Sequence, residues 1–371
     1  MSRLSMKQTS GDELISYIAP AAPATRRPAE GALPFLRPEI GFTPKWFHRH
    51  LDINFDEKWH TDPGYRRQAL LKMRAELRRR FPETKIGRID QPDHPLDLVT
   101  GIYGAASVAA MYGIPIIYAT DNWPNCAHQF LSAEEIKSLK PVDLENNPHF
   151  QALMNQVEQI ALSEGRIEGY INWQGVLNNA QRLRGQDIFM DMITDPSMVN
   201  HLFGCLATTM IEAAKYLHRR QRQSGVDVRF FTVSNCLVNM VSAQHYEQFL
   251  LPRDLQIAGA FKTIGVHNCA WNANPYMDAY AKIKNLRYID MGQESDLHKA
   301  RLLFPQGRRA IMYTPMDIAN KSLAEIRADL LKIADAYGPC DIVAADIEYG
   351  TPDQRVLDLI RICEEISEQR G

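Results

Sequence analysis

The chain alternates short apolar runs with longer amphipathic stretches over most of its length. Runs of four to eight apolar and β-branched residues between turn residues indicate buried strands, and apolar residues that recur every three or four positions indicate helices. The predicted strands are Lys85–Ile89, Ile114–Thr120, Gly169–Trp173, Val228–Ser234, Thr263–His267, Leu286–Met291, Arg309–Thr314 and Asp341–Ile347. The predicted helices include Pro63–Phe81, Thr100–Tyr112, Pro148–Ser163, Pro196–Arg222, Ser242–Phe261, Ser322–Tyr337 and Thr351–Gln369.

Eight strands separated by helices are typical of an α/β fold with a single (β/α)8 TIM barrel. The first strand is ambiguous, because the apolar run Phe35–Phe42 competes with Lys85–Ile89 for that place. Residues 1–33 are rich in alanine and proline, which predicts an N-terminal arm without regular structure. We therefore expect one distorted barrel domain over residues 34–371, with no second domain.

Composition excludes several classes of protein. The 371 residues carry a formal net charge of −2, which gives no basic surface for nucleic acid or for an anionic membrane. No apolar run is long enough to span a bilayer, and the first residues lack the apolar core of a secretion signal. Six scattered cysteines do not form a disulfide framework. We expect a soluble cytoplasmic protein, and the sequence leaves its oligomeric state open, with a homodimer among the options.

The candidate chemistry gathers where the predicted strands end, which is where barrel enzymes place their active sites. His267 and Cys269 end the fifth strand, and two residues with this spacing point to the same side of an extended chain. One imidazole nitrogen and one sulfur aimed at a common point make half of a zinc site. Other polar and aromatic residues at strand ends include Asp121, Trp123, Asn172, Trp173, Cys236, Glu294, Tyr313, Asp346 and Glu348. Many such residues also serve as ordinary turn residues.

The order of these segments resembles the uroporphyrinogen decarboxylase superfamily from about residue 33 to residue 368. Pro34–Trp46 looks like the N-terminal loop of that family, Tyr112–Pro141 is similar to its second strand and following loop, and Val241–Gln256 looks like a recurrent helix start. True porphyrinogen decarboxylases carry a second arginine close after the first in the N-terminal loop. This chain has Arg37, but Gly41 and Phe42 stand where the second arginine would be. A substrate with many carboxylates would lack part of its clamp.

A second branch of the superfamily consists of zinc-dependent methyltransferases that use methylcobalamin or a corrinoid protein. Its signature resembles H-x-C at the fifth strand plus a cysteine at the end of the eighth. His267 and Cys269 match the first part, but the eighth strand ends in Ala-Ala-Asp-Ile-Glu without a cysteine. By position, Asp346 falls nearest to the family's cysteine, and Glu348 is the alternative. The resemblance therefore implies zinc bound by His267, Cys269 and Asp346, a donor set that suits zinc.

The same resemblance implies the activity and the partners. We expect methyl transfer between a small methylated substrate, of methoxy or methylamine type or a thiol acceptor, and a corrinoid that comes on a partner protein. A carboxylate in place of a thiolate makes zinc a stronger Lewis acid, which favours demethylation of an oxygen- or nitrogen-linked methyl group. The predicted catalytic residues are Asp121, Glu294, Tyr313 and Glu348, and the predicted substrate-binding residues are Arg37, Trp123, Asn172, Trp173 and Cys236. The alternatives are a metal-free decarboxylase, in which Arg37 grips a carboxylate, and a non-catalytic barrel that binds a corrinoid.

Overall fold

A parallel β-sheet forms the centre of the computed structural model, which describes residues 34–86 and 95–370. The strand order is β1-β8-β7-β6-β5-β4, and every neighbouring pair is parallel. A separate antiparallel pair joins β2 to β3. The strands are β1 Leu36–Phe42, β2 Ile116–Ile117, β3 Asn125–Cys126, β4 Phe230–Ser234, β5 Thr263–His267, β6 Leu286–Met291, β7 Arg308–Met312 and β8 Cys340–Ile347.

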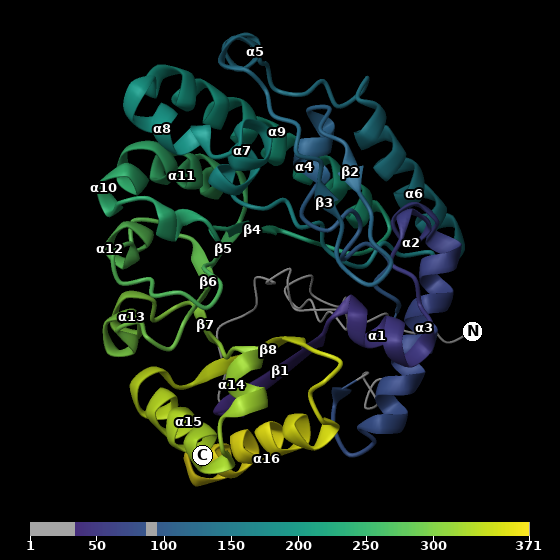
Figure 1. Cartoon of the computed structure of the whole chain (residues 1–371), viewed down its shortest axis with the longest axis vertical. Coiled ribbons are helices and arrows are strands. Elements are labelled where there is room, and N and C mark those ends of the chain that lie inside the picture. Colours follow the sequence, from purple (N-terminus) through teal and green to yellow (C-terminus); the bar gives the residue numbers. More distant parts are fainter. Residues whose placement is uncertain (1–33, 87–94, 371) are drawn as a thin grey trace, which may run out of the picture.

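Helices surround the strands on the outside, so the chain has the (β/α)8 barrel fold that the sequence predicts (Figure 1). Within the described residues, no helix is both long and apolar enough to cross a bilayer. The helices are α1 Pro44–Leu51, α2 Glu57–Thr61, α3 Pro63–Arg80, α4 Ser107–Met111, α5 Ala133–Ser138, α6 Pro148–Glu164, α7 Val176–Arg184, α8 Asp187–Thr194, α9 Pro196–Gln223, η2 Val238–Met240, α10 Ala243–His245, η3 Tyr246–Leu250, α11 Leu251–Ala260, α12 Met277–Tyr280, α13 Leu297–Leu303, α14 Pro315–Asn320, α15 Leu323–Tyr337 and α16 Asp353–Arg370.

The barrel wall is least regular next to β4. The predicted strand Gly169–Trp173 runs beside β4 but forms no ladder of backbone hydrogen bonds with it. The Tyr170 hydroxyl instead bonds the backbone groups of Thr232 in β4. That hydroxyl accepts a hydrogen bond from the Thr232 amide (2.9 Å) and donates to the Thr232 carbonyl (3.2 Å). An isolated parallel bridge from Asp97 to Glu168 continues the wall. The barrel is therefore distorted in this arc, as predicted.

The first two predicted strands can also be compared with the structure. The first strand is Leu36–Phe42, so the apolar run at Phe35–Phe42 takes the place for which Lys85–Ile89 competed. Most of Lys85–Ile89, like the predicted arm at residues 1–33, lies outside the described residues. Of Ile114–Thr120, only Ile116 and Ile117 are strand, paired with the segment that follows the turn.

Side chains inside the barrel form layers along its axis. At the amino ends of the strands, Asp341 accepts hydrogen bonds from Arg37 Nε (2.5 Å) and from Arg308 Nε (2.6 Å). Glu39 lies 3.6 Å from Arg308, which gives two positive and two negative groups in this layer. The next layer contains Tyr288, Ala310, Val343 and Ala345. We call the layer of Arg37, Glu39, Arg308 and Asp341 the basal ion network.

Candidate metal centre

Three metal-ligating side chains converge at the carboxyl ends of β4 and β5. The ligand atoms of Cys236, His267 and Cys269 all lie within 4.8 Å of one another, and Cys269 Sγ is 3.2 Å from His267 Nε2. The strand register explains why they meet. Ser234 of β4 is level with His267 of β5, so Cys236, two residues beyond Ser234, reaches the same height as Cys269.

A buried carboxylate fixes the imidazole of His267. Asp290, which is fully buried on β6, lies 2.6 Å from His267 Nδ1 and also accepts hydrogen bonds from the Tyr288 hydroxyl (2.9 Å) and the Asn268 amide (2.7 Å). With Nδ1 held in this way, Nε2 is the nitrogen that faces the two cysteines. Histidines that bind metals usually have such a partner on the second ring nitrogen. Asp290 was not among the predicted site residues, although an aspartate inside an apolar strand is a visible signal in the sequence.

The two thiols and the imidazole shift one another's pKa. The hydrogen bond with Cys269 holds the pKa of the Cys236 thiol well below its usual range, against the opposing effect of burial. The same hydrogen bond, together with burial, raises the pKa of the Cys269 thiol. Burial lowers the pKa of His267, but the charges of Asp290, Cys269 and Cys236 outweigh it, so the net pKa is raised. The group therefore favours one thiolate beside a charged imidazole before any metal binds.

The converging ligands line a cavity of about 300 Å³ at the mouth of the barrel. Its volume lies at the small end of the range for ligand sites in proteins. The lining residues come from the segment after Tyr170 and from the ends of β4, β5, β7 and β8, and they are Asn172, Gln174, Ser234, Cys236, His267, Cys269, Ala270, Met312, Tyr313, Thr314, Pro315, Ala345 and Asp346.

Backbone strain is concentrated around this cavity. Five non-glycine residues of the described chain have positive φ, and three of them line the cavity: Gln174 at 62°, Cys269 at 54° and Asp346 at 60°. This region of φ is unfavourable for residues with a Cβ atom, and residues held there are often part of functional sites. The strain is an indication of function that does not depend on side-chain chemistry.

A bulge in β8 directs Asp346 into the cavity. Ile40 of β1 pairs with Ala344, but Phe42 pairs with Ile347, so β8 has one extra residue at this point. Val343 and Ala345 face the barrel interior, and regular alternation would therefore turn Asp346 outward. The extra residue and the positive φ of Asp346 turn its side chain toward the mouth instead.

The structure brings together half of the predicted site residues. Asn172, Cys236, His267, Cys269, Tyr313 and Asp346 line the cavity. Asp346 is nevertheless not part of the group whose ligand atoms lie within 4.8 Å of one another, and Cys236 stands in the place predicted for it. Gln174, Ser234 and Thr314 also line the cavity and were not predicted.

Two predicted substrate-binding residues are corrected by the structure. Arg37 belongs to the basal ion network at the opposite end of the barrel, because it lies at the start of β1 rather than in a loop. Trp173 is fully buried and does not line the cavity. Asp121, Trp123, Glu294 and Glu348 do not line the cavity either, and their roles stay predictions.

The barrel, the strained mouth and the converging ligands define a barrel protein with a site at the carboxyl ends of its strands. A family model described as uroporphyrinogen decarboxylase (URO-D) matches residues 92–335, so the chain belongs to this family. A solved structure described as a methyltransferase from Methanosarcina mazei has the same fold, with a TM-score of 0.65 and 13% sequence identity over 91% of this chain and 95% of that one. The comparison with curated proteins found no sequence match.

Proposed function

We propose that this protein is a zinc-dependent methyltransferase that moves a methyl group between a small methylated substrate and a corrinoid carried by a partner protein. The observation that carries the proposal is the convergence of Cys236, His267 and Cys269 in a cavity at the barrel mouth. Membership of the uroporphyrinogen decarboxylase family and the fold shared with a methyltransferase support it.

The donor set fits zinc. Two sulfurs and one imidazole nitrogen are the ligands of catalytic zinc sites that keep a fourth position open, and Asp290 provides the orienting hydrogen bond that such sites need. We propose Cys236, His267 and Cys269 as the ligands, in place of the set with Asp346. Zinc in this position would act as a Lewis acid toward a substrate atom at the open coordination site.

The chain's own residues would prepare the site in three ways. Asp290 holds Nε2 of His267 toward the cysteines, and the hydrogen bond between the two thiols keeps Cys236 ready to bind as a thiolate. The Tyr313 hydroxyl donates a hydrogen bond to Asp329 (2.9 Å), which fixes the ring against the cavity. With two thiolate ligands, the argument from a carboxylate ligand no longer favours an oxygen- or nitrogen-linked methyl group.

The cavity lining is unfavourable for the decarboxylase alternative. A substrate with several carboxylates needs lysine or arginine partners, and none of the described residues that line the cavity is a lysine or an arginine. Arg37, which was predicted to bind the substrate's carboxylate in that reaction, is paired with Asp341 at the other end of the barrel.

The ligand set is tested by zinc content after dialysis against a weak chelator. We expect close to one zinc per wild-type chain, and a fall in affinity of at least about 100-fold for Cys236→Ser and for Cys269→Ser. Asp346→Asn should keep its zinc. Cys205→Ser is the matched control, because Cys205 is a buried cysteine on α9 that does not line the cavity. Loss of zinc from Asp346→Asn together with full zinc in Cys236→Ser would restore the set predicted from the sequence.

The reaction is tested with the zinc-loaded protein and a reduced corrinoid, free or on a carrier protein, by following the visible absorbance change on methylation. We expect turnover with at least one small methylated compound, and none for Cys269→Ser. Decarboxylation of uroporphyrinogen by zinc-free protein would contradict the proposed function.

A further inference from the structure

Asp346 is the one carboxylate among the described residues that line the cavity. The lining has no lysine or arginine to balance it, and its remaining polar groups are amides, hydroxyls and the three proposed metal ligands. The imidazole of His267 and the thiolate beside it offset each other, so the carboxylate of Asp346 leaves the lining with a net negative charge, which attracts ligands of the opposite sign. The cavity is therefore electrostatically suited to cations.

Burial and the charge of Glu348 raise the pKa of Asp346, and among the described residues only the charge of His267 acts on this carboxylate in the opposite sense. No hydrogen bond or ion pair joins it to another described side chain or amide, and it is exposed to the cavity. Asp341 and Asp290, on the same barrel wall, each accept several hydrogen bonds. The bulge in β8 and the positive φ hold Asp346 toward the mouth at the cost of backbone strain. A carboxylate held in this way without an internal hydrogen bond is free to pair with a ligand.

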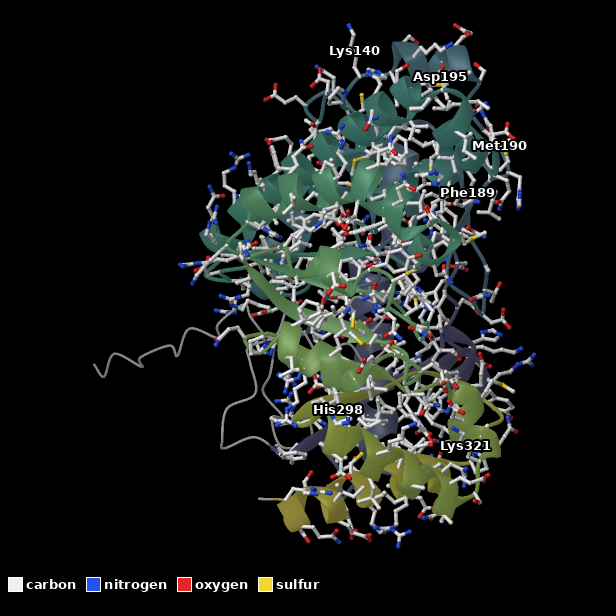
Figure 2. The ribbon with its side chains drawn as sticks, turned by 90° about the vertical axis from the view of Figure 1, so that its left-hand side faces the viewer. Lys140, Phe189, Met190, Asp195, His298 and Lys321 are labelled. Atoms are coloured by element: carbon white, nitrogen blue, oxygen red, sulfur yellow. The ribbon has the colours of Figure 1, made fainter. Side chains whose placement is uncertain are left out.

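Cations near the mouth are already engaged elsewhere. Lys321 lies between Asp317 (2.9 Å) and Asp329 (2.7 Å), at the periphery of the molecule (Figure 2). Arg182 on α7 donates to the Asn178 carbonyl (3.0 Å) and interacts with Cys126 and Cys236 from outside the lining. Neither side chain lines the cavity, so neither occupies the position beside Asp346 that a bound cation would take.

The rest of the lining suits methyl groups. Met312 and the ring of Tyr313 lie on β7 and directly after it, on the wall next to β8. Thioether and aromatic surfaces are favourable for the polarised methyl groups of an alkylated ammonium ion. The cavity therefore combines one fixed negative charge with an adjoining apolar wall.

We propose that Asp346 makes the cavity selective for small cations, and that the substrate is accordingly a methylated ammonium compound whose charge pairs with this carboxylate. The identification of the ligand as a methyl donor or acceptor rests on the proposed function. The charge selectivity itself is a property of the cavity and needs neither zinc nor a corrinoid.

The selectivity is measured with the cavity thiols as reporters, in reduced, metal-free protein. Three methanethiosulfonates with the same reactive group are used, bearing a trimethylammonium, a hydroxyl or a sulfonate group. In each case the thiolate sulfur attacks the sulfenyl sulfur, which forms a mixed disulfide and releases methanesulfinate. Mass spectrometry gives the rate at Cys236 and Cys269 separately, and each rate is divided by the rate with a small free thiol.

We expect the trimethylammonium probe to react faster than the sulfonate probe, and we expect Asp346→Asn to lower this ratio about tenfold at low ionic strength. Asparagine tolerates positive φ, so this variant should fold. Glu348→Gln removes the same charge two residues away, outside the lining, and should change the ratio much less. Added salt should reduce the wild-type ratio more than that of Asp346→Asn.

A ratio that is unchanged in Asp346→Asn, or a sulfonate probe that reacts faster in the wild type, would overturn the inference. These outcomes are separate from those that test the proposed function. Zinc binding and methyl transfer with an unchanged ratio would refute the role of Asp346 alone. A ratio that falls as expected in a protein that binds no zinc would support the cavity's selectivity and refute the metal-dependent reaction.

Discussion

The two ends of the barrel interior hold polar clusters that differ in how well their charges are satisfied. In the basal ion network, Asp341 accepts two hydrogen bonds from Arg308 and one from Arg37, and Glu39 supplies the second negative charge. At the mouth, Asp346 has no such partner among the residues described. In the basal ion network each buried charge faces an opposite charge, although Nη1 and Nη2 of Arg37 have no hydrogen-bond partner in the described chain, and removing one member would leave an uncompensated buried charge. Asp346 is exposed to the cavity instead, where its charge is available for a ligand.

The backbone also differs between the two ends: it is regular at the base of the barrel and irregular at the mouth. From Leu36 to Ile40, β1 pairs with β8 in unbroken parallel register, and the shift occurs only beyond Ala344, at the mouth. Three positive-φ residues line the cavity there, whereas no residue of the basal ion network has positive φ. One strand, β8, therefore carries an ion-paired aspartate at its start and an aspartate with strained backbone at its end.

The largest expected effect comes from breaking the basal ion network. Asp341→Ala leaves the buried guanidinium groups of Arg37 and Arg308 without their carboxylate, which should cost about 3–5 kcal/mol of the free energy of unfolding. Urea denaturation measures this change. Asp346→Asn, at the other end of β8, should change the free energy of unfolding by less than about 1 kcal/mol. Equal effects of the two substitutions would remove the distinction between the ends.

The comparison also separates what the sequence could predict from what it could not. The barrel and the H-x-C pair followed from local pattern, because alternating strands and helices and the i, i+2 spacing are local properties. Cys236 was placed in the pocket but not among the ligands, since its role depends on the register between β4 and β5, which no local pattern defines.

Arg37 was predicted at the wrong end of the barrel for a related reason, whereas Asp346 lines the cavity at the mouth, where it was predicted to lie, and only its proposed role changes. The height of Arg37 in the barrel depends on where β1 begins relative to β8, and the sequence left the first strand ambiguous. The direction of Asp346 depends on a single extra residue in β8, and a one-residue shift reverses the face of every side chain beyond it. The location of a side chain along or across the barrel depends on how distant strands pair, so it could be obtained only from the structure.

An intermediate effect is expected from the support of His267. Asp290→Asn removes the negative charge that lies beside Nδ1 of His267. This substitution should lower zinc affinity about 10- to 100-fold, because such carboxylates hold the imidazole ring in place and raise its basicity. Competition with a chromophoric chelator measures the affinity. Tyr288→Phe is the matched control, since it removes only a hydrogen bond to the same carboxylate and should have the smaller effect. A folded Asp290→Asn protein with wild-type affinity would show that this carboxylate serves the barrel core rather than the metal centre.

The smallest expected effect isolates the strain at the end of β8. Asp346→Gly and Asp346→Ala both remove the carboxylate, but only glycine adopts a φ of 60° without strain. The glycine variant should therefore be more stable than the alanine variant by about 1 kcal/mol, and at least as stable as the wild type.

The order should reverse at Ala344, two residues earlier in regular strand, where replacement of alanine by glycine should cost about 0.5–1 kcal/mol or more. Thermal and urea unfolding of the three variants measure these differences. If alanine and glycine are equally stable at position 346, the backbone there is relaxed, and the strain that distinguishes the mouth from the base of the barrel does not exist.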